Sequence, residues 1–316
     1  MEKFAFVIHP IVVRDDASKK FPVARWFPEP VVAAAMRHVE PMVVAHLEGI
    51  RSIAGPEAEG WFLGCPLAPK YLLGLPPEDV YKKLEICCRK AEALGAKVIG
   101  LGALTSVAGD GGITLAKRTS LAVTTGNSYT VATAVEGAKR GAESMGIAFG
   151  DANVAVIGAA GSIGRTAAML LGPDARRTTL IGRQREKLEP VARDVAGRGA
   201  RHVDISDDIE AGLADADVVV TVTSSADAIV EPRHLKKGAV VCDVARPRDV
   251  SVRVAKERPD VLVIEGGLVR IPGAMTTTTT SSKGVDRPDR EPFSFGFPPG
   301  TAYACMSETM MLALEG

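Results

Sequence analysis

The hydrophobic pattern alternates between short apolar runs and longer amphipathic stretches, which is typical of an α/β protein. Mainly apolar runs predict buried strands at residues 4–8, 61–67, 98–101, 154–157, 218–222, 240–244 and 261–264, and two further strands are expected at 178–181 and 201–203. Apolar residues at helical spacing predict helices over residues 30–47, 77–94 and 128–145, and again from residue 162. Pro41 lies inside the first helix and is expected to kink it. The polar segment 14–30 is expected to be a loop.

A chain of 316 residues is long enough for two domains. We expect an N-terminal α/β domain (1–126), a bridging helix (127–150) and a second α/β domain with a parallel sheet of about six strands (151–270). Residues 271–316 are expected to form a mobile, irregular loop and a C-terminal helix. The loop prediction depends on the threonine run 276–280, which is extended by Ser281 and Ser282 and followed by a proline-rich segment.

A glycine turn follows the predicted strand 154–157. Glycines recur every third residue there, and an amphipathic helix begins directly after the turn, with Gly158, Gly161, Ser162, Ile163 and Gly164 at the junction. This order of strand, turn and helix is the dinucleotide-binding fingerprint, because the glycines let the backbone approach a pyrophosphate at a helix N-terminus. Small residues also pack helices on strands without any ligand. The βαβ unit that follows favours the cofactor-binding interpretation.

The cofactor preference depends on the end of the next strand. Arg183 and Arg185 follow the strand 178–181, where an acidic residue would bind the ribose 2′-hydroxyl of NAD. Guanidinium groups suit a 2′-phosphate instead, so the sequence predicts NADPH. Residues 151–270 are therefore expected to be a Rossmann-type NADP-binding domain, and residues 1–126 the α/β substrate domain. The alternative is that both arginines are simply solvated. Thr221 and Thr223, at the end of the strand 218–222, are expected to lie beside the cofactor.

A polar cluster precedes the helix 128–145, which leads into the glycine turn. Thr125 or Asn127 can cap this helix, and Ser128 is its first residue. Because the helix bridges the two predicted domains, we expect its N-terminus to face the cleft between them. The alternative is an N-cap without any ligand contact.

Composition narrows the function classes. Lys and Arg total 38, as do Asp and Glu, so the zero net charge favours neither nucleic acid nor a membrane surface as partner. No apolar run approaches a membrane span, and the N-terminus lacks the pattern of a signal peptide. The five cysteines form no metal-binding or redox spacing, so we expect a cytoplasmic protein without a metal site. A homo-oligomer is compatible with this composition.

Cys305 is the candidate nucleophile. Residues 298–300, two prolines and a glycine, interrupt regular secondary structure before a run of helix-forming residues. Thr301 can serve as N-cap of the C-terminal helix, so Cys305 falls in the first turns of that helix. A helix N-terminus favours the thiolate, which is the reactive form. A buried packing cysteine is the alternative, and spacing alone favours it.

Four segments together resemble the long-chain fatty acyl-ACP reductases of cyanobacterial type. They are LGALTSVAGD (101–110), TTGNSYT (124–130), VAVIGAAGSIG (154–164) and AYACMSETMMLALEG (302–316). The similarity extends from about residue 61 to the end of the chain. CDVARPRDV (242–250) more weakly resembles the nucleotide domain of the shikimate dehydrogenase and glutamyl-tRNA reductase group.

The resemblance implies an NADPH-dependent oxidoreductase of lipid metabolism. In that family a cysteine takes the acyl group from acyl carrier protein or acyl-CoA, and reduction of the thioester intermediate yields a fatty aldehyde. Cys305 occupies the cysteine's position. Donors for the oxyanion would come from backbone N–H groups or from Asn127, Ser128 and Tyr303, with Thr125 also at the substrate.

Two alternatives remain open. One is an NADP-dependent alcohol or hydroxy-acid dehydrogenase of shikimate-dehydrogenase-like architecture, in which Cys305 is structural. The other is a non-catalytic NADP-binding regulatory protein.

Overall fold

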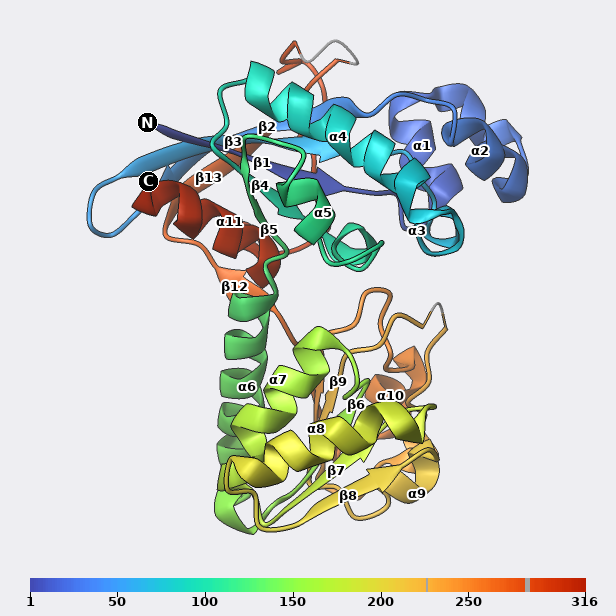
Figure 1. The fold of residues 1–316 in the computed structure, drawn as a ribbon, viewed down its shortest axis with the longest axis vertical. Coiled ribbons are helices and arrows are strands. Elements are labelled where there is room, and N and C mark those ends of the chain that lie inside the picture. The colour runs from blue at the N-terminus through green and yellow to red at the C-terminus, as the bar shows by residue number, and fades with distance from the viewer. Residues whose placement is uncertain (226, 282–284) are drawn as a thin grey trace. The chain divides into compact units, whose positions relative to one another are not determined.

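The computed structural model describes residues 1–225, 227–281 and 285–316, and the chain divides into two compact units (Figure 1). Unit 1 consists of Met1–Gly126 and Val269–Gly316, and unit 2 consists of Asn127–Leu268. Each unit contains a six-stranded sheet with helices packed against it. The predicted α/β fold class is therefore confirmed.

Unit 2 has the strand order of a Rossmann-type sheet. Its strands, all parallel, are β6 (Asn153–Ile157), β7 (Arg177–Ile181), β8 (Val203–Ser206), β9 (Val218–Thr221), β10 (Val240–Asp243) and β11 (Leu262–Glu265). They lie in the order β11-β10-β9-β6-β7-β8, so the strand order reverses between β6 and β9. Dinucleotides bind at the carboxyl ends of the strands beside such a switch point.

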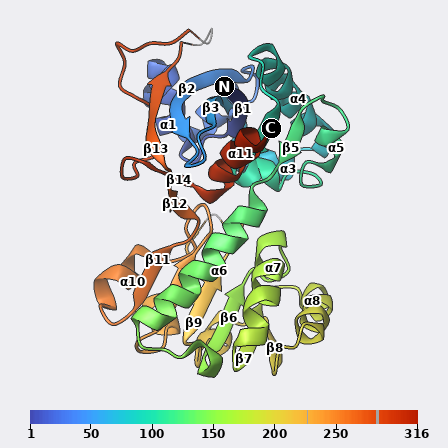
Figure 2. The ribbon, with the colours of Figure 1, turned by 90° about the vertical axis from the view of Figure 1, so that its left-hand side faces the viewer.

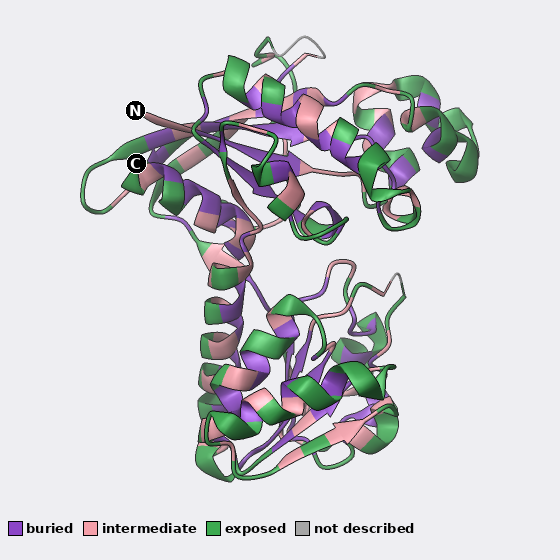
Figure 3. Cartoon of the chain, viewed as in Figure 1, coloured by how far each residue is buried: buried purple, intermediate pink, exposed green. Residues whose placement is uncertain are grey.

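Helices cover both faces of the unit 2 sheet. They are α6 (Asn127–Ser144), α7 (Ser162–Leu171), α8 (Arg185–Gly197), α9 (Ile209–Leu213) and α10 (Val252–Glu257). Val154 and Val156 of β6 pack with residues of α6, α7 and α8, whereas Ala155 and Ile157 pack with residues of α9 and α10. This alternation follows from the two-residue period of a strand. Figure 2 shows α6 running across the sheet, and Figure 3 shows that the strands are mainly buried.

Unit 1 is built on a mixed sheet. Its strands are β1 (Glu2–Ile8), β2 (Met42–Arg51), β3 (Glu57–Gly64), β4 (Val98–Leu101), β5 (Ala122–Thr124) and β13 (Gly273–Thr279), in the order β13-β2-β3-β1-β4-β5. The strands β3, β1, β4 and β5 are parallel, and β2 and β13 extend the sheet in antiparallel fashion. A separate pair joins β12 (Leu268–Arg270) to β14 (Thr301–Tyr303).

The helices of unit 1 divide between the two faces of its sheet. They are α1 (Val13–Lys20), α2 (Glu29–Met36), α3 (Pro69–Gly74), α4 (Pro77–Ala93), α5 (Ile113–Ala116) and α11 (Ala304–Glu315). Ala5 and Val7 of β1 pack in the cluster that contains α4, and Phe4 and Phe6 pack in the cluster that contains α11. The C-terminal helix is thus one face of the unit 1 core. In the described ranges, no helix combines the length and apolarity that crossing a bilayer requires.

The predicted kinked helix over residues 30–47 is wrong in its second half. The chain forms α2 over the first half and then, after Pro41, enters β2. Burial along β2 alternates, with Val43, Ala45 and Leu47 inside. Apolar residues keep helical spacing up to Val39, so the change to the two-residue period of a strand was not recognised in the sequence.

The predicted loop over the threonine run is also wrong, because β13 contains most of it and pairs with β2. The hydroxyls of Thr277 and Thr279 donate to the carbonyls of Phe293 (2.6 Å) and Glu291 (2.8 Å). Threonine is β-branched, so a polar threonine run suits a sheet edge as well as a loop. Residues 282–284 of the predicted loop, including Ser282, lie outside the described residues.

Two smaller predictions also need correction. The segment 14–30 contains most of α1 and a short 3-10 helix, Pro22–Trp26, rather than loop alone. The strand expected at 201–203 begins only at Val203, as β8.

Candidate functional site

The glycine turn after β6 has the geometry of the dinucleotide fingerprint. Gly158 has φ +80°, a conformation that side chains with a Cβ rarely adopt. A Cβ there would also collide with the carbonyl of Val222, the residue that follows β9. Only glycine therefore allows the chain to leave β6 beside β9 at the switch point.

The rest of the turn forms an open cradle at the start of α7. A Cβ on Gly164 would collide with the backbone of Gly158, so this glycine sets the close packing of helix on strand. At Gly161, by contrast, an added Cβ would meet only the Gly158 carbonyl (3.3 Å) among the described residues. Gly161 and Ser162 are exposed, and the first N–H groups of a helix have no acceptor within it. The cradle fits a pyrophosphate in shape and in charge.

The two sequence-predicted arginines lie just past β7. Arg183 and Arg185 are both exposed, and the Arg185 guanidinium lies 4.0 Å from the Glu189 carboxylate on the next turn of α8. Exposed ion pairs of this kind contribute little to stability. Both side chains therefore remain available to an anionic ligand at the end of the strand.

Thr221 and Thr223 meet at the switch point, where both hydrogen-bond to Asp249. The Asp249 carboxylate accepts the Thr221 hydroxyl (2.6 Å), the Thr223 hydroxyl (2.6 Å) and the Thr223 N–H (2.9 Å). Thr221 and Asp249 are fully buried. The Thr221 hydroxyl thus orders the loop after β9. The sequence prediction missed Asp249, although it lies in the quoted segment 242–250.

A second buried carboxylate supports the same loop. Asp243 accepts the N–H groups of Ala245 and Val250 (both 3.0 Å). Burial raises the pKa of Asp243, and the nearby Asp249 charge raises it further. Together the two carboxylates hold the loops after β9 and β10.

We predict that Asp249→Ala lowers the free energy of unfolding by about 1–3 kcal/mol, because the buried Thr221 hydroxyl loses its acceptor. Asp249→Asn keeps an acceptor and relieves repulsion with Asp243, so its effect is expected to be smaller. Urea denaturation of the two variants and the wild type measures the difference. Equal stability of Asp249→Ala and the wild type would contradict this account.

The start of α6 lies beside the glycine turn. The Asn127 amide nitrogen is 3.5 Å from the Ser162 hydroxyl, at the long limit of a hydrogen bond. The first residues of α6 and α7 therefore adjoin each other. Ser128 is exposed in the first turn of α6, and Thr125 is half-buried just before it.

Cys305 differs from the other four cysteines in its surroundings. Those four are buried, whereas Cys305 is half-buried. Burial raises the pKa of Cys65 and of Cys88 to about 11 and of Cys242 to about 12, and raises that of Cys87 well above its usual range. Because the thiolate is the nucleophile, these four thiols are poor candidates for chemistry at neutral pH.

The chain positions Cys305 through close backbone packing. Cys305 is the second residue of α11, which begins at Ala304 rather than after the predicted N-cap Thr301; Thr301 and Tyr303 lie in β14. Gly126, with φ +69°, lies against it: a Cβ on Gly126 would collide with Cys305 Cα and Cβ and stand 2.5 Å from its carbonyl oxygen. The segment 124–126 thus packs directly against the candidate nucleophile.

A carboxylate on α11 is hydrogen-bonded to the same segment. The Thr124 hydroxyl donates to Glu308 Oε1 (2.6 Å) and accepts the Gly126 N–H (3.1 Å). Glu308 is half-buried and follows Cys305 by three residues, so the two share one flank of the helix. Neither Thr124 nor Glu308 was among the site residues predicted from the sequence.

Aromatic side chains surround the start of α11. The Tyr303 ring lies 5.5 Å from Phe295 and 4.9 Å from Phe297, centroid to centroid. Phe293 and Phe295 in turn pack on the buried Phe62 of β3, at 5.3 and 5.4 Å. These ring contacts connect Tyr303, at the start of α11, to the buried Phe62 of the unit 1 core.

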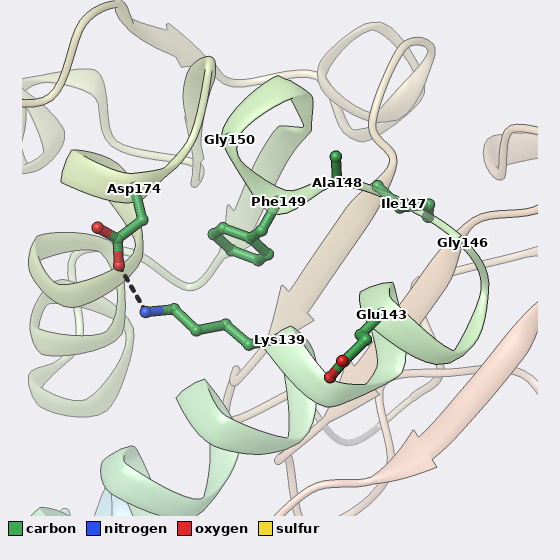
Figure 4. Close-up of a pocket in the computed structure, with 8 residues that line it drawn as sticks. All are labelled: Lys139, Glu143, Gly146, Ile147, Ala148, Phe149, Gly150 and Asp174. Carbon is green, nitrogen blue, oxygen red and sulfur yellow. Dashed lines mark hydrogen bonds and ion pairs between the residues drawn. The ribbon is translucent and has the colours of Figure 1, made fainter.

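Unit 2 also has an open surface hollow of about 580 Å³ (Figure 4). Lys139 and Glu143 of α6 line it with Phe149 and Asp174, and the Lys139 ammonium pairs with the Asp174 carboxylate at 2.5 Å. The hollow lies on the segment that precedes β6, at the opposite end of this strand from the glycine turn. It is therefore separate from the cradle. Across the described residues, no group of three or more His, Cys, Asp or Glu side chains is arranged to hold a metal ion.

Comparison with known proteins gives several partial matches. Residues 140–265 match the sequence profile of the Shikimate / quinate 5-dehydrogenase family. Over 277 residues the chain is 26% identical to the long-chain acyl-[acyl-carrier-protein] reductase of Synechococcus elongatus, covering 84% of this chain and 76% of that protein. Over 222 residues it is 28% identical to the aminotransferase PigE of a Serratia species, covering 70% of this chain. The chain spans only 24% of the length of PigE.

A similar solved structure is the glutamyl-tRNA reductase of Methanopyrus kandleri. It is 26% identical with a TM-score of 0.35, over 60% of this chain and 46% of that one. The profile match covers the glycine turn and the parallel sheet, whose order and cradle are those of a dinucleotide-binding domain. Unit 2 is therefore an NAD(P)-binding domain of Rossmann type, and the chain is related to NAD(P)-dependent reductases.

Proposed function

We propose that this protein reduces an acyl thioester, carried by acyl carrier protein or coenzyme A, to an aldehyde through an acyl group bound to Cys305. The observation that carries the proposal is the setting of Cys305. It is the one half-buried thiol of five, it lies in the first turn of a helix, and Gly126 packs against its backbone. The similarity to the Synechococcus reductase, which extends over 84% of this chain, supports the same reaction.

In the proposed reaction, the sulfur of Cys305 attacks the carbonyl carbon of the substrate thioester. The new carbon–sulfur bond forms as the bond to the carrier sulfur breaks, and the carrier leaves as a thiol. The acyl group is then fixed on α11, so its carbonyl carbon no longer diffuses before reduction. Positive potential at the helix start stabilises the negative charge that develops on the sulfur and on the thioester oxygen during attack.

The side chains of Tyr303, Thr125, Asn127 and Ser128 are our proposed donors and substrate contacts near the thioester oxygen. Tyr303 immediately precedes α11, and the other three lie in or beside the segment that packs against Cys305. Each carries a hydroxyl or amide donor.

The dinucleotide is held, in this proposal, by the cradle of Gly158, Gly161, Ser162, Ile163 and Gly164. NADPH bound there would supply a hydride to the acyl carbon. With one proton taken up and the bond from that carbon to the Cys305 sulfur broken, the aldehyde would leave, the Cys305 thiol would be restored and NADP⁺ would remain. Thr223 and the buried Thr221 keep the loop after β9 in place beside the cradle, through their hydrogen bonds to Asp249.

We predict that NADPH binds more tightly than NADH, because Arg183 and Arg185 follow β7, where the ribose phosphate is bound in Rossmann domains. Replacing both with Ala should remove most of this preference, on the order of 1–3 kcal/mol for the loss of charge-assisted hydrogen bonds. Titration of the two proteins with each dinucleotide measures it. Equal affinities in the wild type would rule the preference out.

The direct test of the proposed function is intact-mass spectrometry after mixing the protein with a set of acyl-CoA thioesters in the absence of NADPH. We expect a mass increase equal to one acyl group. Addition of NADPH should remove the adduct and release one equivalent of aldehyde. Absence of an adduct with every thioester, together with persistent turnover of another substrate, would contradict the proposal.

A second candidate is an alcohol or hydroxy-acid dehydrogenase, because residues 140–265 match the Shikimate / quinate 5-dehydrogenase profile. In that case Cys305 would be a packing residue. Turnover of an alcohol that survives Cys305→Ala would favour this candidate over thioester reduction. Tight NADPH binding without turnover of any thioester or alcohol would favour a non-catalytic regulatory protein.

A further inference from the structure

We infer that Glu308 is the proton acceptor for the Cys305 thiol when the acyl group is transferred. The inference rests on the proposed function. It concerns only the acyl-transfer half of the reaction, which needs no dinucleotide. It assigns a role to a residue that the sequence motifs did not single out.

The placement of Glu308 on α11 is the first observation. The helix buries Met306, Met310 and Ala313 against the unit 1 core, while Cys305 and Glu308 remain half-buried. Residues three apart on a helix lie about 5–6 Å apart at Cβ and on the same side. This spacing allows the carboxylate to approach the sulfur, directly or through one water molecule.

The hydrogen bonding of the carboxylate is the second observation. The Gly126 N–H donates to the Thr124 hydroxyl (3.1 Å), and this hydroxyl donates to Glu308 Oε1 (2.6 Å). Thr124 and Glu308 lie in the same unit, 184 residues apart in sequence. Accepting this hydroxyl restrains the orientation of the Glu308 carboxylate on α11. The same segment, through Gly126, contacts the Cys305 backbone.

The proton balance of acyl transfer requires such a group. As the bond from the Cys305 sulfur to the acyl carbon forms, the thiol loses its proton to the Glu308 carboxylate. As the bond to the carrier sulfur breaks, the carboxyl group returns this proton to the departing sulfur, which leaves as a thiol. No oxidant or reductant is involved, and Glu308 ends the step as a carboxylate. A general base in this position accelerates such a step by about 10²–10⁴-fold.

The test is the rate at which Cys305 is acylated by an acyl-CoA without NADPH, followed by intact mass between pH 6 and pH 8. An unaided thiol, with an ordinary pKa of about 8.5, would react about tenfold faster for each unit of pH. With Glu308 as the base, the wild-type rate is expected to be nearly flat over this range. Glu308→Gln should react about a hundredfold more slowly at neutral pH, with a rate that rises with pH.

A set of substitutions distinguishes loss of the proton acceptor from a change in the local structure around Cys305. Glu308→Gln keeps an oxygen acceptor for the Thr124 hydroxyl and removes only the base. Glu308→Asp keeps a carboxylate and should retain the flat pH profile at a lower rate. Thr124→Val removes the orienting hydroxyl, and Thr124→Ser restores it. The matched control is Glu315→Gln, an exposed glutamate at the end of the same helix, which should acylate as the wild type does.

The outcomes distinguish this inference from the proposed function. Absence of an adduct in the wild type would contradict the proposed function and this inference with it. An adduct that forms equally fast in Glu308→Gln would overturn the inference alone. A Glu308→Gln rate that is lowered equally at every pH would also overturn it, because a structural defect does not change the pH profile. Should Glu308→Gln fail to fold, a wild-type rate that rises tenfold per pH unit would by itself exclude a carboxylate base.

Discussion

Cys305→Ala is expected to abolish aldehyde formation and the acyl adduct, while NADPH affinity stays at the wild-type value. The sulfur is the atom that carries the acyl group in the proposed reaction, so its loss leaves no covalent intermediate. The substitution lies in unit 1, whereas the dinucleotide cradle belongs to unit 2. Intact mass, aldehyde assay and NADPH titration of the purified variant test the three parts separately.

Two matched variants make this result specific. Cys65→Ala and Cys242→Ala each remove a buried thiol whose pKa burial raises to about 11 and about 12. Both should still form the acyl adduct, because those thiols are protonated at neutral pH. An adduct that maps to Cys65 in the wild type would mean that the wrong thiol has been chosen. Aldehyde formation that persists in Cys305→Ala would mean that hydride reaches a substrate that is not covalently bound.

The parts of the molecule that the sequence predicted well depend on local chemistry. The glycine turn is an example: Gly158 needs a positive φ and Gly164 needs close packing, and both demands show directly in residue type and spacing. The strands 154–157 and 218–222, which are apolar except for Thr221, likewise predict a sheet that is covered on both faces. Unit 2 is therefore the region where sequence and structure agree most closely.

The sequence-based predictions failed in two situations. In one, the helical spacing of apolar residues changes directly to the two-residue spacing of a strand. In the other, the strands that pair lie far apart in the chain. Around Pro41 a helix and a strand follow each other directly, and both contain valines and alanines, so the change of period was missed. The threonine run could be assigned to a strand only with its partner β2, which lies more than two hundred residues earlier in the chain. Strand pairing of this kind is a tertiary effect that local propensity does not encode.

The residues that surround the candidate site could not be found from motifs for the same reason. Asp249 matters because it meets Thr221 and Thr223, and Glu308 matters because it meets Thr124. An isolated acidic residue in a helix or loop is usually solvated, so neither was distinguishable from a surface carboxylate in the sequence. What distinguishes them is a hydrogen bond to a residue distant in the sequence: Asp249 bonds to Thr221, 28 residues away, and Glu308 bonds to Thr124, 184 residues away.

Gly126→Ala is expected to prevent acylation of Cys305, although the thiol itself is unchanged. Gly126 has φ +69°, where an alanine costs roughly 1–2 kcal/mol. The larger effect is steric, because the added Cβ would collide with Cys305 Cα and Cβ and come within 2.5 Å of its carbonyl oxygen. Backbone atoms cannot rotate away as a side chain can, so either segment 124–126 or the start of α11 must move. A displacement of about 1 Å at a reacting group can lower a rate by about a hundredfold.

Gly146→Ala is the matched control for this variant. Gly146 has nearly the same backbone conformation, φ +72°, but nothing lies within 4 Å of where its Cβ would stand among the described residues. The control should therefore lose a similar amount of backbone stability and keep the wild-type acylation rate. Urea denaturation and the intact-mass assay of both variants separate strain from misplacement. If Gly126→Ala were acylated as fast as Gly146→Ala, then the close packing of Gly126 on α11 would not be what holds Cys305 in position for attack.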